Sequence, residues 1–211
     1  MIDTKDRILD AAERLFAAEG YGAVSLRQII GEAGVNLAAI HYHFGSKEEL
    51  LDEAVMRKAG PVNIERLARL DRLEAQAGRE GAPPQVEQIL EAFLMPMAEA
   101  AARHREFTRL MGRMQAEGIL TEVLMRNFQP VLGRFFGALR RALPHLPENE
   151  FGWRVHFMQG AIAQTMSSDP APFTGAIETG GFPARIERLI AFLGGAFRAP
   201  SPKIKRAGKK K

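Results

Sequence analysis

The sequence has no cysteine among its 211 residues, so disulfide bonds, thiol nucleophiles and thiolate metal sites are excluded. Aromatic residues make up only 8% of the chain, and no long stretch alternates apolar and polar residues as a half-buried strand would. The longest apolar runs, such as 190–197, are too short to cross a bilayer. The first residues, MIDTKDR, are charged where a secretory signal would be apolar. We therefore expect an all-helical, cytoplasmic protein without membrane contact.

The basic charge is concentrated at the carboxyl-terminal end. The formal net charge is +4, but residues 198–211 hold seven lysines and arginines and no acid, which leaves the rest of the chain at −3. Two prolines near the start of this segment and its low hydrophobicity predict a disordered basic tail over 199–211. Two interpretations of the tail stay open, a solubilising end or an arm that attracts phosphates non-specifically.

Three short amphipathic segments begin the chain. Apolar residues recur at helical spacing across 4–19, and two glycines end that run. Ser25 is placed to cap a second helix, which ends at Gly34. Only two residues, the second of them Asn36, separate it from a third segment over 37–44. Two helices joined by so short a turn are typical of a helix-turn-helix.

A larger helical region follows. Ser46 and Glu49 have the spacing of a capping box, so a linking helix is expected over 46–59, interrupted by Gly60-Pro61. A DNA-binding domain is therefore expected over 1–48, and an effector-binding and dimerisation domain over 49–198. Further helices are predicted at about 62–77, 85–103, 106–117, 121–143, 148–168 and 183–198, with a kink at Pro130 and loops over 78–84 and 169–181.

The histidines of IHYHF, residues 40–44, suggest a metal site at first sight. His41 and His43 are two residues apart, which places them about 200° apart around a helix, so they cannot share one ion. The other histidines are isolated, and no zinc, phosphate-loop or serine-hydrolase motif is present. We therefore expect no metal, no cofactor and no enzymatic activity.

A helix-turn-helix explains the same segment better. In that motif the second helix lies in the major groove, with its first residues at the base edges. Residues 37–39 would then face the bases, and 41–43 would lie outward or on the rim. Small apolar residues can touch thymine methyl groups but cannot make bidentate hydrogen bonds to bases. Direct readout would therefore fall mainly on Arg27 and on Asn36 or His41.

The charge of this segment is low for a DNA-binding domain that acts alone. Residues 1–47 carry five basic side chains against six acids, a net charge of −1. Such a charge suits a module that works as a dimer, in which a few donors and the helix N-termini make the phosphate contacts.

Four motifs follow one another at fixed spacing in this region: ILDAAERLF, GYGAVSLRQI, AGVN and IHYHFGSKEEL. Together they resemble the TetR family of bacterial transcriptional repressors over residues 8–51. The resemblance departs at His41, where tyrosine is usual, and at Ile30, where alanine is usual. It implies base contacts from Arg27 and 37–39, and phosphate contacts from the start of the second helix and the end of the third. The expected DNA-binding residues are Ser25, Arg27, Asn36, Leu37, Ala38, Ala39, His41, Tyr42, His43 and Lys47.

The resemblance also implies the role of the larger domain. In this family it binds a small effector in an internal cavity and dimerises through its last two long helices. NLAAIHYHFGSK, F-x-R-L-M-G at 107–112 and W-R-V-H-F-M-x-G-A at 153–161 are similar to PsrA-like members, which respond to long-chain fatty acids or their acyl-CoA forms. The expected ligand-binding residues are Phe93, Met97, Met111, Met114, Phe128 and Met158, with Arg109, Arg154 or His156 for an acidic head group.

The same resemblance, together with late apolar stripes at helical spacing, predicts a dimer interface. Its expected residues are Trp153, Phe157, Gly160, Ala161, Ile186, Leu189, Ile190, Leu193 and Phe197. Plain core packing stays open as the alternative for every one of these apolar stripes.

The sequence therefore predicts a homodimeric repressor that binds a palindromic operator in double-stranded DNA. Its release would follow binding of an apolar effector such as a long-chain fatty acid or acyl-CoA. The alternative is a helical interaction protein that keeps the fold but not operator binding. An enzyme ranks below both, because no catalytic set of residues converges.

Overall fold

The computed structural model describes residues 3–103, 105–167 and 180–202, and every regular element in these ranges is an α-helix. Most of the predicted tail 199–211 and most of the predicted connection 169–181 lie outside the described residues. The helices are α1 Thr4–Glu19, α2 Leu26–Ala33, α3 Leu37–Phe44, α4 Lys47–Glu80, α5 Val86–Arg103, α6 Arg105–Ala116, α7 Leu120–Asn127, α8 Gln129–Ala142, α9 Glu148–Ser167 and α10 Gly181–Arg198. The predicted all-helical architecture with an N-terminal helix-turn-helix is confirmed.

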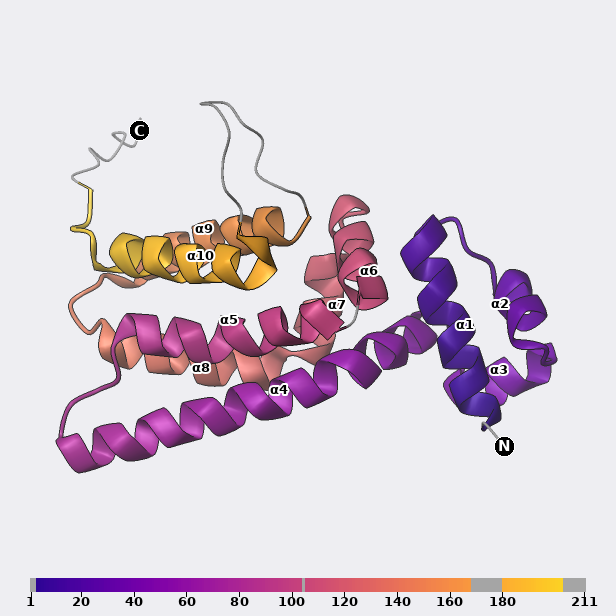
Figure 1. The fold of residues 1–211 in the computed structure, drawn as a ribbon, viewed down its shortest axis with the longest axis horizontal. Helices are drawn as coiled ribbons and strands as arrows, with labels where there is room; N and C mark the ends of the chain where they lie inside the picture. The colour runs from indigo at the N-terminus through magenta and orange to yellow at the C-terminus, as the bar shows by residue number, and fades with distance from the viewer. Residues whose placement is uncertain (1–2, 104, 168–179, 203–211) are drawn as a thin grey trace, which may run out of the picture.

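Helices α1, α2 and α3 form a small unit at one end of the molecule (Figure 1). Helix α4 runs from this unit along the underside of α5 and α8, and α9 and α10 lie on the opposite side of α5. Helices α6 and α7 lie between the small unit and the larger bundle.

Buried apolar side chains form two separate cores. The first joins α1, α2 and α3 to the start of α4 and to α6 and α7, around Phe16 and Ile40. The second joins α5, α8, α9 and α10 to the later part of α4, around Leu70, Phe135 and Phe197. Two helices of the predicted larger domain, α6 and α7, therefore complete the core of the small unit.

Helix α4 is continuous, which corrects the predicted interruption at Gly60-Pro61. It spans 34 residues with Pro61 inside it. The proline has no N–H to donate to the carbonyl four residues earlier, so the helix loses one hydrogen bond there. Buried side chains lie on both sides of the proline, and their packing maintains the helix across it. These side chains are Leu50, Leu51, Ala54, Val55, Ala59, Asn63, Arg66 and Leu70.

The predicted helix over 121–143 is in fact two helices, α7 and α8, which meet at Phe128. The φ and ψ angles of Phe128 are −116° and 0°, and its N–H donates to the Leu124 carbonyl at 2.8 Å. Pro130 lies in the first turn of α8, where a missing N–H removes no hydrogen bond within the helix. The proline therefore begins a helix instead of kinking one.

Candidate nucleic-acid interface

Side-chain caps fix the ends of α2 and α3. Ser25 and Gln28 form a capping box, in which the Gln28 side chain accepts from the Ser25 N–H at 2.7 Å. Gly34 ends α2 in the left-handed region, with φ 61° and ψ 43°. Asn36 Oδ1 accepts from the Ala39 N–H at 2.9 Å and begins α3. The predicted caps and the short turn between them are confirmed.

Helix α1 makes a contact with this turn that sequence analysis missed. Arg7 Nη2 donates to the carbonyls of Ala33 and Gly34, at 2.5 and 3.0 Å. The last carbonyls of a helix receive no hydrogen bond from an N–H of the same helix, so a donor from outside is needed to satisfy them. Arg7 therefore holds α2 and the start of the turn in place against α1.

Helix α3 has one buried side and one exposed side. Ile40 and Phe44 are 0% and 4% exposed and belong to the first core. Tyr42 is 85% exposed, and its ring meets the His43 ring edge-on with 5.1 Å between centroids. The exposed side also carries Leu37, Ala38 and His41, with Ala39 and His43 half-buried at its margins. The side predicted to face DNA is therefore open to solvent.

The three side chains predicted to read bases differ in how far they are engaged. Arg27 is exposed and makes no hydrogen bond or ion pair with any described residue. Asn36 uses its Oδ1 in the cap, and His41 Nδ1 lies 3.0 Å from the Gly45 carbonyl. Of these three side chains, Arg27 is therefore the one that no described residue engages.

Lys47, predicted to contact phosphate, is anchored on the turn between α1 and α2. Its Nζ donates to the Tyr21 carbonyl at 2.5 Å and lies 4.2 Å from the centre of the Tyr21 ring. Burial lowers the pKa of Lys47, and the charge of Glu117 opposes that effect. An ammonium group has three donors, so a phosphate contact from this anchored position leaves the Tyr21 bond intact.

The end of α6 contacts the last turn of α1 and the turn that follows it, and Figure 1 shows α6 alongside α1. Arg113 Nη2 donates to the Ala18 carbonyl at 2.8 Å, near the end of α1. Glu117 Oε2 accepts from the Gly22 N–H at 3.1 Å. Glu117 directly follows α6 and lies four residues after Arg113, so the same side at the end of that helix supplies both contacts. The position of the small unit is therefore tied directly to α6.

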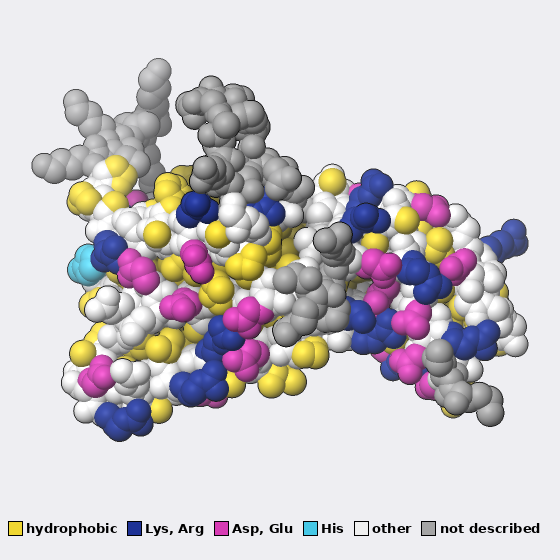
Figure 2. Space-filling model, viewed as in Figure 1, with side chains coloured by type: hydrophobic (Ala, Val, Ile, Leu, Met, Phe, Trp, Pro, Cys, Tyr) yellow, Lys and Arg dark blue, Asp and Glu magenta, His cyan; other side chains and the backbone are white. Residues whose placement is uncertain are grey.

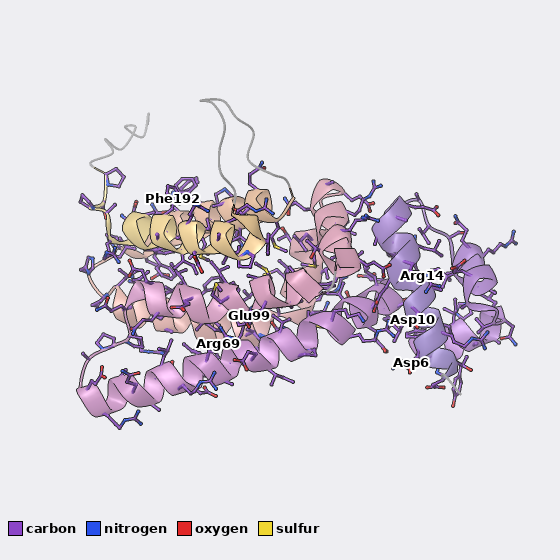
Figure 3. All side chains as sticks on the ribbon, in the orientation of Figure 1. Asp6, Asp10, Arg14, Arg69, Glu99 and Phe192 are labelled. Atoms are coloured by element: carbon purple, nitrogen blue, oxygen red, sulfur yellow. The ribbon has the colours of Figure 1, made fainter. Side chains whose placement is uncertain are left out.

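Charges of both signs are mixed over α1, α2 and α3. Basic and acidic side chains lie next to one another on the face shown in Figure 2. Arg14 pairs with Glu32 at 2.9 Å, and Arg57 of α4 reaches Asp10 at 2.5 Å and Glu13 at 2.7 Å. Figure 3 labels Asp10 and Arg14 along α1. This pairing leaves few free cations, in agreement with the net charge of −1.

The apolar residues predicted to bind an effector do not come together. Three belong to the first core and three lie in or against the second: Met111, Met114 and Phe128, then Phe93, Met97 and Met158. Phe93 and Met158 line a slot of about 10 Å³. That volume holds one water molecule at most.

The three residues predicted to bind an acidic head group also lie in different surroundings. Arg154 is buried and donates to the carbonyls of Ala196 and Phe197, at 3.0 and 2.6 Å, so it satisfies the end of α10. His156 is exposed beside the Trp153 ring. Arg109 lines a crevice of about 800 Å³ between α6 and the ends of α5, α9 and α10.

Helices α9 and α10 carry an exposed apolar face that matches half of the predicted dimer interface. Trp153 and Phe157 are 51% and 64% exposed and stack with 5.6 Å between ring centroids. Gly160 is exposed and Ala161 half-buried on the same helix. Phe192 of α10 is 66% exposed and lies on the side of α10 away from α5 in Figure 3.

The other half of the predicted interface lies inside the protomer. Its α10 residues are at most 9% exposed and pack in the second core: Ile186, Leu189, Ile190, Leu193 and Phe197. Side chains already buried within one chain have no surface left for a partner. The large apolar side chain that α10 exposes is Phe192 instead.

Two family models match this chain. The model for "Bacterial regulatory proteins, tetR family" matches residues 8–54, and the "Tetracyclin repressor-like, C-terminal domain" matches residues 87–196, about half of the chain. The chain belongs to the TetR family. This is a family of regulatory proteins and not of enzymes. None of the described helices contains an apolar stretch that could span a bilayer, and the described residues contain no cluster of three potential metal ligands.

Individual TetR-family relatives agree with this assignment. The regulator LmrA of Bacillus subtilis is 48% identical over 54 residues, which are 25% of this chain and 29% of LmrA. The regulator Mb3439c of Mycobacterium bovis is 30% identical over 148 residues, 70% of each chain. The structure of a TetR-family regulator from Shewanella sp. PV-4 superposes with a TM-score of 0.67 at 18% identity, over 92% of this chain and 97% of that one. The last likeness shows a shared fold.

Proposed function

We propose that the protein is a DNA-binding transcriptional regulator that represses from a palindromic operator as a homodimer. The observation that carries this proposal is the exposed side of α3, with the unengaged Arg27 at the start of the neighbouring α2. An α-helix fits the major groove of B-DNA, where base edges are distinguishable. The division into a DNA-facing unit, 1–48, and an effector and dimer unit, 49–198, belongs to the same proposal.

Base and phosphate contacts would come from different parts of this surface. Leu37 and Ala38 would touch thymine methyl groups, and Arg27 would donate to a base. The N-terminus of α2 at Ser25 offers free backbone N–H groups to a phosphate. The free amide of Asn36 would add a contact at the start of α3. Tyr42, His43 and Lys47 would complete the contacts at its other end, with Ala39 and His41 between the two groups.

Dimerisation would use the exposed apolar face of α9 and α10. Trp153, Phe157 and Phe192 together expose large apolar rings, which monomeric proteins rarely leave grouped in water. Gly160 on the same side of α9 allows a partner helix to approach closely. A two-fold dimer through this face presents two copies of α3 to two half-sites and so suits a palindromic operator.

Release would follow binding of an apolar or amphipathic effector, such as a long-chain fatty acid or its acyl-CoA form. The motif similarity at 107–112 and 153–161 supports this class. The crevice of about 800 Å³ beside Arg109 has the volume usual for a small-molecule site. An effector can shift DNA binding only if it prefers one arrangement of the two DNA-facing units.

The DNA-binding proposal is tested with the region upstream of the protein's own gene. Fluorescence anisotropy at several salt concentrations compares that DNA with a scrambled duplex. The wild type is expected to prefer the upstream DNA, and the double variant Arg27→Ala/Tyr42→Ala to lose at least about tenfold in affinity for it. Loss of one phosphate contact should also lower the salt slope by about 1.

Arg79→Ala is the matched control, because Arg79 is an exposed arginine at the far end of α4. It should bind the upstream DNA as the wild type does, and circular dichroism should show all variants folded. A wild type without preference for its upstream DNA or salt dependence would favour the alternative, a helical interaction protein with the same fold. The mixed charge over α1, α2 and α3 is the observation that keeps this alternative in the test.

A further inference from the structure

The side chains at the exposed side of α3 differ in the hydrogen-bonding groups that they offer to DNA. Arg27 has donors only. Asn36 Oδ1 accepts from the Ala39 N–H, so the groups that this side chain has left are its amide donors. Bases also present donors in the major groove, namely the N6 amino group of adenine and the N4 amino group of cytosine. Recognition of these amino groups requires an acceptor on the protein.

His41 is placed to supply such an acceptor. Its side chain is exposed, like those of Leu37 and Ala38. It lies four residues after Leu37 and three after Ala38, so the three side chains share one face of α3. Those two apolar side chains would touch the bases, and the imidazole of His41 would therefore lie beside a neighbouring base.

A hydrogen bond within the chain determines which nitrogen of the His41 ring is free. Nδ1 lies 3.0 Å from the Gly45 carbonyl oxygen. A carbonyl oxygen only accepts, so Nδ1 must carry the proton of this bond. A neutral imidazole has one N–H, and Nε2 of His41 therefore holds a lone pair that accepts. His43 differs, because no described residue bonds to either of its ring nitrogens.

The capping box of α4 orients the carbonyl that selects this tautomer. The peptide group between Gly45 and Ser46 donates through the Ser46 N–H to Glu49 Oε2 at 3.0 Å, and accepts from His41 through its carbonyl. Hydrogen bonds in such a chain polarise and strengthen one another. Gly45 has a φ of 74°, which side chains rarely adopt, and this turn directs its carbonyl back to α3. Glu49 is thus a positioning residue that acts on His41 through one peptide group.

We propose that His41 is a specificity-determining residue whose Nε2 accepts a hydrogen bond from the exocyclic amino group of an adenine or a cytosine. This inference rests on the proposed function and names the base chemistry that the surface recognises. Guanine and thymine present acceptors at the same edge, and a lone pair that faces an acceptor makes no hydrogen bond. Each half-site would therefore place an amino-bearing base beside His41, in addition to the base that Arg27 contacts through its donors.

Nitrogen-15 NMR tests the tautomer without DNA. Long-range proton–nitrogen correlation spectra of the full-length protein at alkaline pH distinguish protonated from unprotonated ring nitrogens, and His41→Gln assigns the signals. His41 is expected to have a protonated Nδ1 and an unprotonated Nε2. A protonated Nε2 would overturn the proposed acceptor.

The same spectra test the positioning role of Glu49. Glu49→Ala removes the acceptor of the Ser46 N–H and should produce a mixture of the two His41 tautomers. Glu49→Gln keeps an oxygen that can accept and should keep the single tautomer. One tautomer in both variants would mean that Glu49 only caps α4, and its positioning role would be wrong. Circular dichroism should show both variants folded.

Selection from a pool of random duplexes tests the base preference. The wild type should favour adenine or cytosine about tenfold at one position of each half-site, and His41→Ala should lose the preference there alone. His41→Lys has donors only and should favour guanine at that position. His145→Ala is the control, because His145 is an exposed histidine between α8 and α9. A wild-type preference for guanine or thymine at the position that changes in His41→Ala would overturn the inference.

Removal of the amino group from the DNA isolates the hydrogen bond. In the selected duplex, purine replaces the adenine, or 2-pyrimidinone replaces the cytosine, and fluorescence anisotropy measures affinity. The wild type should bind the altered duplex about tenfold more weakly, whereas His41→Ala should lose little. Any weakening of the base pair affects both proteins alike and cancels in the comparison. Equal losses in the two proteins would show that His41 does not contact the amino group.

The selection also separates this inference from the proposed function. A wild type that enriches no sequence would overturn the proposed function, and the inference with it. A wild type that enriches a half-site which His41→Ala and His41→Lys enrich equally would overturn the inference alone, and operator binding would stand.

Discussion

Helix α4 carries an arginine toward each of the two cores, and the two arginines meet opposite surroundings. Arg57 pairs with acids of α1, including Glu13, which is only 8% exposed. Arg66 is 6% exposed and donates to the Phe93 carbonyl at 2.7 Å and to Asn63 at 2.9 Å, with no carboxylate partner among the described residues. The first core is thus joined to α4 by opposite charges, and the second by neutral acceptors around one cation.

This difference predicts that a change of charge breaks one junction and spares the other. A buried charge that loses its partner is costly, because the remaining ion has neither water nor a counter-ion. A buried cation without a counter-ion is already costly, so its removal forfeits little. Three experiments, in order of expected effect, test the comparison.

The largest effect is expected from Arg57→Gln. The change leaves the Glu13 carboxylate buried without its main partner and should lower the free energy of unfolding by about 3 kcal/mol. Urea denaturation followed by circular dichroism measures it. Arg72→Gln is the control, because Arg72 on the same helix pairs with Glu65 at the surface and should cost about 0–1 kcal/mol. Equal costs for the two variants would refute the importance of burial at Glu13.

An intermediate effect is expected from the double variant Glu13→Gln/Arg57→Gln. Removing both charges eliminates the uncompensated carboxylate, so the loss should shrink to about 1–2 kcal/mol. The same denaturation measurement applies. A double variant less stable than Arg57→Gln alone would show that shape, and not charge, sets the cost at this junction.

The smallest effect at neutral pH is expected from Arg66→Met, which should stay within about 1 kcal/mol of the wild type. Burial lowers the pKa of Arg66 to about 10, below its ordinary value, so above that pH the folded state releases this proton before the unfolded state does. The wild type should therefore gain stability relative to Arg66→Met as the pH rises through about 10. Thermal denaturation of both proteins across that range measures the difference, and a difference independent of pH would contradict the buried cation.

Features with local causes could be predicted from the sequence, and features that join distant segments could not. Caps such as Ser25 and Asn36 bond to backbone groups three residues away, so their spacing alone reveals them. The contacts of Arg113 and Glu117 with the α1–α2 turn span 95 residues, and no local pattern marks them. Arg66 lies in a heavily charged segment, where one buried arginine resembles its exposed neighbours.

Apolar periodicity was informative only in part. It predicted the stripe on α10 that ends at Phe197 but not what covers it, because the same spacing suits a partner chain or another helix of the same chain. Here α5 packs against α10, and the stripe lies in the second core.

Prolines were ambiguous for a similar reason. Pro61 is tolerated within α4 and Pro130 begins α8, and only the surrounding packing separates the two cases.

The unbroken length of α4 has a mechanical consequence. A helix of 34 residues is about 50 Å long, at about 1.5 Å per residue. Because its later turns are embedded in the second core and its first turns follow directly after α3, it acts as a lever arm. A tilt of about 5° at the bundle end displaces its first turn by about 4 Å, close to the rise of one base pair. Such a tilt would move α3 and the rest of the first core relative to the second core by about the distance between neighbouring base pairs.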